Sequence, residues 1–183
     1  MTGTAANGKD SDLCGMSTQP TAEDLALLLT YFPAIDLPVT ITFTSHHAFS
    51  RDNKPLPEML SDFFLATWEG ETPDEFTEYI PGFHFEEKNY LGLVYWKAGL
   101  LHYAYVLVIM DKKGRFIERK ILAETEVADT QVRQGAAMIT ADGEIFMVES
   151  EHDGNDDLAD PTQSVVDRYR IKPDGEIEQA AGA

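Results

Sequence analysis

The chain has 183 residues, of which 32 are acidic and 14 basic, for a formal net charge of -18. A hydrophobic content of 43% supplies enough apolar surface for a folded core and argues against global disorder. The charge disfavours nucleic acids and anionic membranes as partners, because the long-range field of the chain repels both. Such a length and composition predict a single domain, and any protein partner is expected to be basic.

The N-terminal residues 1–19 are polar and rich in Gly, Thr and Ser, which predicts a flexible tail ahead of one α+β domain at residues 20–183. Cys14 is the single cysteine, so no disulfide forms within the chain. No apolar run is long enough to span a bilayer. We expect a soluble protein, either cytoplasmic or exported, with the tail as the remnant of a removed signal in the second case.

Residues 20–82 are predicted to form the helical and mixed part of the domain. Thr21 has the features of a helix N-cap, and the helix that follows ends before Pro33. Further elements are expected in chain order, namely a strand at Val39 to Phe43, a polar connection at Thr44 to Lys54, and helices at Pro57 to Leu65 and Thr72 to Ile80.

Residues 83–179 change to a period of two and predict an antiparallel β-meander. Asp/Gly turns separate its apolar strands at Asp111–Gly114, Asp142–Gly143 and Asp174–Gly175, because tight hairpin turns need backbone angles that Gly tolerates. The segment around Asp142–Gly143 resembles hairpins of β-propeller blades, but the chain is too short for a closed propeller. The predicted fold is therefore α+β, with short N-terminal helices packed on a curved antiparallel sheet.

Motifs for catalysis and for cofactor binding are incomplete. The Gly3 to Lys9 segment lacks the hydroxyl residue and the strand–loop–helix context of a phosphate-binding loop. The acidic segment from Asp153 offers oxygen donors suited to Ca²⁺, but Leu158 stands where an EF-hand loop needs Gly. The histidines share no ligand spacing. We therefore expect no metal, no cofactor and no enzymatic activity, with weak Ca²⁺ binding as the alternative interpretation of the acidic loop.

The charge is segregated along the chain. Residues 21–90 carry 13 acids and 3 bases, residues 141–183 carry 12 and 3, and residues 91–140 carry 5 and 7. This pattern favours a non-enzymatic interaction module whose acidic surface binds a basic protein, as an inhibitor or immunity-type protein or as an exported surface domain. The expected contact surface lies in an acidic loop at residues 149–163 and comprises Glu149, Glu151, Asp153, Asp156, Asp157 and Asp160.

An aromatic cluster supports a different function. Its residues precede the first hairpin turn, and we expect them to gather in a cavity of the curved sheet and bind a small ligand there. They are Tyr95, Trp96, Tyr103 and Tyr105. A hydrolase that uses carboxylates with His46 or His47 is a third and least favoured hypothesis, because abundant carboxylates alone do not indicate a catalytic pair.

Overall fold

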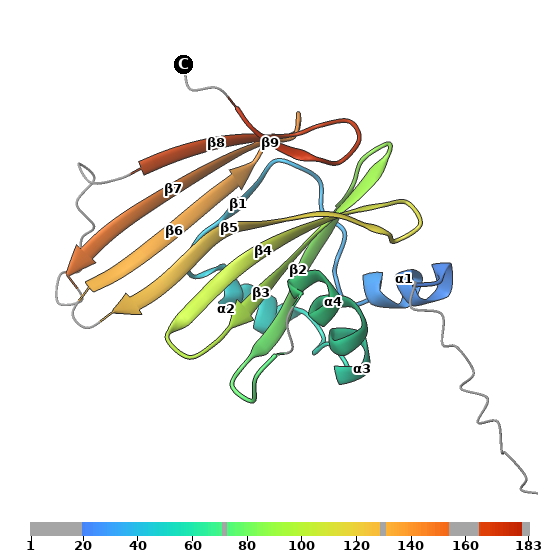
Figure 1. The fold of residues 1–183 in the computed structure, drawn as a ribbon, viewed down its shortest axis with the longest axis horizontal. Helices are drawn as coiled ribbons and strands as arrows, with labels where there is room; N and C mark the ends of the chain where they lie inside the picture. The colour runs from blue at the N-terminus through green and yellow to red at the C-terminus, as the bar shows by residue number, and fades with distance from the viewer. Residues whose placement is uncertain (1–19, 71–72, 129–130, 154–164, 181–183) are drawn as a thin grey trace, which may run out of the picture.

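A computed structural model of the chain describes residues 20–70, 73–128, 131–153 and 165–180 (Figure 1). Short helices precede a nine-stranded antiparallel sheet that does not close into a barrel. The expected class, a mostly β protein with a few short helices, is confirmed. The helical elements are α1 (Ala22–Leu29), α2 (Ser45–Asp52), α3 (Glu58–Leu60), the π-helical turn η1 (Ser61–Leu65) and α4 (Ala66–Glu69).

The strands follow one another in the sheet in the order of the chain, from β2 to β9. Their bounds are β1 (Val39–Ile41), β2 (Glu78–Glu86), β3 (Tyr90–Ala98), β4 (His102–Asp111), β5 (Phe116–Ala128), β6 (Gln131–Ile139), β7 (Glu144–Asp153), β8 (Val165–Ile171) and β9 (Ile177–Gln179). Strands β5 and β6 pair only at Thr125–Ala128 with Gln131–Gln134, and the short β1 pairs with the last three residues of β6, Ala137 to Ile139.

Two hydrophobic cores lie on opposite faces of β3 and β4. One core contains Leu93 and Val106 together with Leu28 of α1 and Phe64 of η1. The other contains alternate residues of the same strands, such as Leu107, with residues of β1 and β6 to β8. Because β3 and β4 are buried on both faces, their sequences are almost continuously apolar rather than alternating.

The sheet curves so strongly that its last strands return to its middle. The Glu118 carboxylate of β5 accepts a hydrogen bond of 2.6 Å from the Ile177 N–H of β9. The Lys120 Nζ atom lies 3.6 Å from the centroid of the Tyr169 ring of β8, a cation–π contact between the same two regions. These contacts enclose the core that contains Leu107 within the curve of the sheet. The two edge strands, β2 and β9, do not pair with each other.

The three Asp/Gly segments connect neighbouring antiparallel strands. Gly114, Gly143 and Gly175 have φ angles of 81, 79 and 92°, in the left-handed region. Each glycine N–H donates to the carbonyl three residues earlier, at distances of 2.9 to 3.1 Å. A hydrogen-bonded turn that ends in a left-handed glycine is typical of a common three-residue hairpin loop.

Two predicted elements of the N-terminal part are wrong. The predicted polar connection at Thr44 to Lys54 contains the helix α2. None of its residues is fully buried, so its sequence lacks the apolar stripe by which an amphipathic helix is predicted. The expected helix at Thr72 to Ile80 is absent from the described part of that segment, because β2 begins at Glu78. The Asp74 carboxylate there accepts hydrogen bonds from the Phe76 N–H and the Thr77 hydroxyl. An aspartate at a helix N-cap makes similar bonds, but here they stabilise a turn.

Other predictions hold in part. Helix α1 begins after the expected N-cap, Thr21, in a capping box with Asp24. The predicted helix at Pro57 to Leu65 exists and continues to Glu69. Residues 149–153 of the expected acidic loop belong to β7, and residues 154–163 lie outside the described residues. Residues 1–19, the predicted tail, lie outside the described residues.

We predict that Gly175→Ala lowers the free energy of unfolding by about 2–4 kcal/mol, because a left-handed alanine and an overpacked site are both unfavourable. The added Cβ would lie 2.9 Å from side-chain atoms of Ile109 and Ile117. Gly70→Ala is the control, since Gly70 has a φ of 72° and no atom within 4 Å of the new Cβ. Urea unfolding followed by tryptophan fluorescence measures both variants, and equal losses would contradict the prediction.

Candidate functional site

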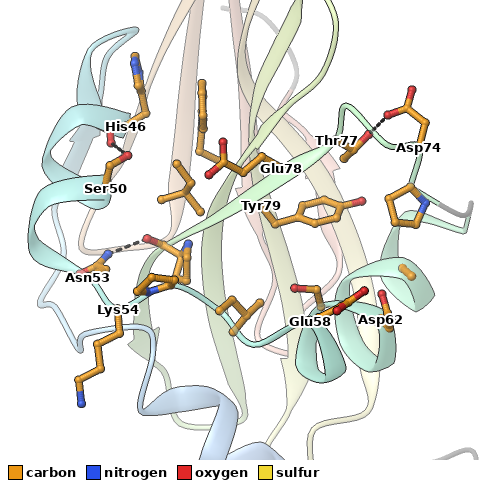
Figure 2. Close-up of a pocket in the computed structure, with 18 of the residues that line it drawn as sticks. His46, Ser50, Asn53, Lys54, Glu58, Asp62, Asp74, Thr77, Glu78 and Tyr79 are labelled. Atoms are coloured by element: carbon orange, nitrogen blue, oxygen red, sulfur yellow. Dashed lines mark hydrogen bonds between the residues drawn. The ribbon is translucent and has the colours of Figure 1, made fainter.

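A cleft of about 980 Å³ lies along the edge strand β2, between α2 and the helical segment that begins with α3. Figure 2 shows His46 and Ser50 of α2 on one side, Glu58 and Asp62 on the other, and β2 between them. The register of β2 with β3 pairs Ile80 with Trp96, which also lines the cleft. The cleft therefore straddles the edge of the sheet and receives side chains from both of its faces.

Asn53 and Phe49 attach α2 to the sheet. The Asn53 side-chain amide donates to the carbonyls of Pro81 and Gly82, at 2.6 and 2.7 Å. The Phe49 ring packs edge-on against Phe83 and Tyr105, with centroids 6.0 Å apart in each pair. This side of the cleft is thus tied directly to β2 and β4.

His46 joins α2 to a stack of aromatic rings. Its imidazole lies parallel to the Trp96 ring at a centroid distance of 4.6 Å, and Trp96 is in turn parallel to Tyr103 at 5.7 Å. Burial, together with the neighbouring His47, lowers the pKa of His46, so its imidazole is neutral at pH 7. Burial raises the pKa of Tyr105, which accepts the His46 backbone N–H, to about 12.

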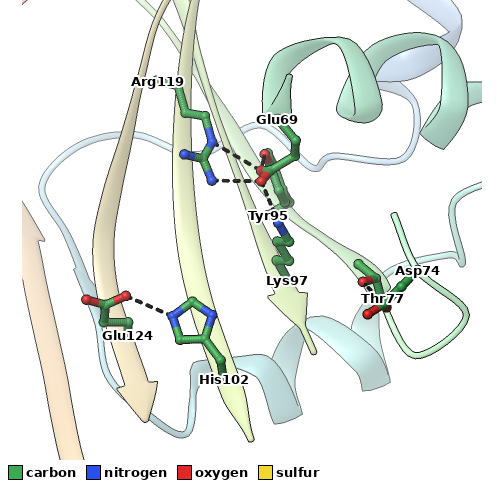
Figure 3. Close-up of polar contacts among 8 residues, drawn as sticks. All are labelled: Glu69, Asp74, Thr77, Tyr95, Lys97, His102, Arg119 and Glu124. Atoms are coloured by element: carbon green, nitrogen blue, oxygen red, sulfur yellow. Dashed lines mark hydrogen bonds and ion pairs between the residues drawn. The ribbon is translucent and has the colours of Figure 1, made fainter. Parts of the chain in front are cut away.

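The opposite side of the cleft is anchored by a buried carboxylate at the end of α4. The Glu69 side chain is 1% exposed and receives hydrogen bonds from Lys97, at 2.7 Å, from Arg119, at 2.8 and 3.1 Å, and from the Tyr95 hydroxyl (Figure 3). Burial alone would raise the pKa of Glu69, but these hydrogen bonds and the two cations together lower it. The carboxylate stays ionised and connects α4 to β3 and β5.

Besides Asp74, whose carboxylate accepts hydrogen bonds within its own turn, four carboxylates line the cleft, on α3, on η1, in the turn before β2 and on β2: Glu58, Asp62, Glu75 and Glu78. All four are exposed, and among the described residues none forms an ion pair with Lys, Arg or His. Glu58 and Asp62 stand four residues apart in one helical segment, where like charges repel each other. Within the described lining, Lys54 is the single Lys or Arg side chain.

The acidic residues predicted from the sequence lie elsewhere. Glu149 and Glu151 belong to β7, which four strands separate from β2 in the sheet order, and they pair there with Gly135 and Arg133. The structure does not describe the side chain of Asp153, and Asp156, Asp157 and Asp160 lie outside the described residues.

The four predicted aromatic residues do not share one cavity. Tyr95 belongs to the core beneath α1 and the α3–α4 segment, whereas Tyr105 belongs to the core on the other face of the sheet. The strand register places Tyr95 and Tyr105 on opposite faces, because the cross-strand partner of Tyr95 is Val106 and the partner of Tyr105 is Trp96. Of the four aromatic residues, only Trp96 is among the described residues that line the cleft.

The cleft was not predicted from the sequence, although two signals of it are present there. The Glu58/Asp62 pair is an unfavourable like-charge spacing inside a predicted helix. The segment from Asp74 to Glu78 adds three more acids within five residues. Only the packing of two helices beside one strand brings these two groups together.

Comparison with family models, curated proteins and solved structures finds no match to this chain. The fold and the cleft therefore define it as an α+β protein with an open, curved antiparallel sheet and an acidic cleft at the sheet edge. Among the described residues, no helix is both long and apolar enough to cross a membrane. The same residues contain no group of three or more His, Cys, Asp or Glu side chains suited to a metal ion.

We predict that Glu69→Gln lowers the free energy of unfolding at pH 7 by about 2–3 kcal/mol, because Lys97 and Arg119 then lose their shared counter-ion. The lowered pKa of Glu69 means that its contribution is complete above the ordinary value of 4.5 and disappears as the pH falls through the lowered value. Unfolding curves of wild type and variant should therefore converge on acidification.

The matched control is Glu124→Gln, which removes a carboxylate from the partly exposed pair with His102 (Figure 3). Exposed pairs contribute little, so this variant should lose less than about 1 kcal/mol at pH 7. A Glu69 variant as stable as the Glu124 variant would show that the buried carboxylate does not anchor the helix.

Proposed function

We propose that this protein is a non-enzymatic interaction module that holds a basic segment of a protein partner in the cleft beside β2. The observation that carries the proposal is the set of four exposed carboxylates, Glu58, Asp62, Glu75 and Glu78, which have no cationic partner among the described residues. A lysine or arginine side chain in the cleft would supply that partner. Carboxylates also match the fork of a guanidinium, which binds both oxygens at once.

Repulsion within the cleft favours such a ligand. Like charges at the spacing of Glu58 and Asp62 destabilise a helix by about 0.2–0.5 kcal/mol, and a bound cation relieves this cost. Asp74 differs from the four, since its carboxylate already accepts hydrogen bonds from Phe76 and Thr77. The carboxylates left to bind a cation are therefore one on α3, one on η1, one in the turn before β2 and one on β2: Glu58, Asp62, Glu75 and Glu78.

A catalytic role has weaker support in the cleft. General acid catalysis by a carboxyl at neutral pH depends on burial, and the four cleft carboxylates are exposed. The Nδ1 atom of His46 lies 2.9 Å from the Phe43 carbonyl oxygen and 3.1 Å from the Tyr105 hydroxyl. These contacts and the stack with Trp96 favour a structural role for this imidazole.

Small-ligand binding is the second candidate function, favoured by the exposure of one aromatic residue, Trp96, to the cleft. Its other proposed contacts are less available. The Tyr95 hydroxyl donates to Glu69, and the Tyr105 hydroxyl accepts from the His46 backbone. An inhibitor or immunity-type protein and an exported surface domain are two settings for the favoured function, and both use the same cleft.

We predict that replacing the four cleft carboxylates together, by Glu58→Gln, Asp62→Asn, Glu75→Gln and Glu78→Gln, weakens binding of a short polyarginine peptide about tenfold at low salt. This expectation takes about 0.3–0.5 kcal/mol for each exposed charge pair. Added salt should weaken the wild type more than the variant, because screening acts over about 10 Å at 0.1 M. Fluorescence anisotropy of a labelled peptide measures both effects.

A charge-matched control tests whether the cleft or the overall charge attracts the peptide. Converting Asp153, Asp156, Asp157 and Asp160 to Asn removes the same formal charge from the acidic segment that the sequence analysis favoured. The cleft proposal expects this control to bind nearly as the wild type does. If the control loses as much affinity as the cleft variant, the peptide responds only to net charge or to the acidic segment, and the cleft is not the site.

A further inference from the structure

The hairpin between β3 and β4 exposes two leucines at its tip. Leu100 is 73% exposed and Leu101 is 55% exposed. The turn is tight, since the Gly99 N–H donates to the His102 carbonyl at 2.8 Å. Adjacent large apolar side chains at the end of a hairpin bury little surface within their own chain, so they contribute little to its core.

Leu101 also has an unfavourable backbone conformation. Its φ is 63°, and it is the single non-glycine residue with a positive φ in the part of the chain that the structure describes. Hairpin turns that need a left-handed residue usually place Gly or Asn there, because a leucine Cβ is crowded in that region. The tip thus keeps an apolar side chain where backbone preference favours glycine, and such strain is often found at binding sites.

The register of the sheet places this tip beside the cleft. Ala98 of β3 pairs with Glu78 of β2, one of the four cleft carboxylates, and the chain continues from Ala98 directly into the tip. The Val127 N–H of β5 donates to the Leu101 carbonyl at 3.2 Å, which holds the tip against the neighbouring strand. An apolar projection therefore adjoins the acidic cleft at the β3–β4 end.

We propose that Leu100 and Leu101 form an apolar anchor for the partner segment, so that the preferred ligand carries basic residues followed or preceded by large apolar ones. This inference rests on the function proposed for the cleft. The carboxylates attract and align the basic part, and the leucines pack against the apolar part. Charge complementarity favours a peptide over a lipid surface as the occupant, because a chain of net charge -18 is repelled by anionic membranes.

The test compares two probes, a short polyarginine peptide and the same peptide with a pair of leucines added at one end or the other. Wild-type protein should bind one of the leucine-bearing peptides about fivefold more tightly than the plain peptide, as expected for partial burial of two leucines. The combined Leu100→Ser and Leu101→Gly variant should lose this preference and still bind the plain peptide. Its melting temperature should not fall, because glycine suits the left-handed position.

The control is Leu27→Ser, which removes an exposed leucine (44%) from α1, a helix that contributes no residue to the described lining of the cleft. This variant should keep the wild-type preference. A tip variant that also keeps the preference would overturn the anchor and leave the cleft proposal intact. If wild type and the cleft variant bind the plain peptide equally, the cleft proposal itself fails. Binding of wild type, but not of the tip variant, to phosphatidylcholine vesicles would assign the leucines to a membrane and overturn the peptide anchor.

Discussion

Strands β3 and β4 are buried on both faces, and the other elements are arranged around this pair. On one face, α1 and the α3–α4 segment cover residues such as Leu93 and Val106. On the other, the curved sheet brings β1 and β6 to β8 over residues such as Leu107. Both cores need the same two strands, so loss of either packing partner exposes apolar surface of β3 and β4.

The cleft arises where this arrangement leaves an edge. Strand β2 pairs with β3 on one side. Among the described residues, its other side is covered only in places, by the backbone hydrogen bonds of His84 with Pro33 and Ile35 and by the Asn53 amide. Acidic side chains along an open edge also oppose edge-to-edge association of sheets. The same carboxylates can therefore protect the edge and attract a basic segment. Both roles use exposed charges, so neither requires a buried carboxylate.

Sequence patterns predicted the elements whose local chemistry agrees with their tertiary role. The cap at Thr21, the helix after Pro57 and the Asp/Gly hairpins are examples, because each depends on residues adjacent in the chain. Prediction failed at α2, a polar helix that contacts of Phe49, Asn53 and His46 attach to the sheet. It failed again at Asp74, where a cap-like side chain begins a turn that leads into an edge strand.

The sequence by itself determined the class of fold, the hairpin positions and the excess of negative charge, since these depend on composition and on contacts between near neighbours. Only the tertiary structure decided which carboxylates share a site. Glu69 is buried against Lys97 and Arg119, whereas Glu58 and Glu78 face an open cleft without counter-ions among the described residues, and the local sequence does not show this difference in burial. The physical reason is that burial and pairing are set by residues distant in the chain, which only the folded sheet brings together.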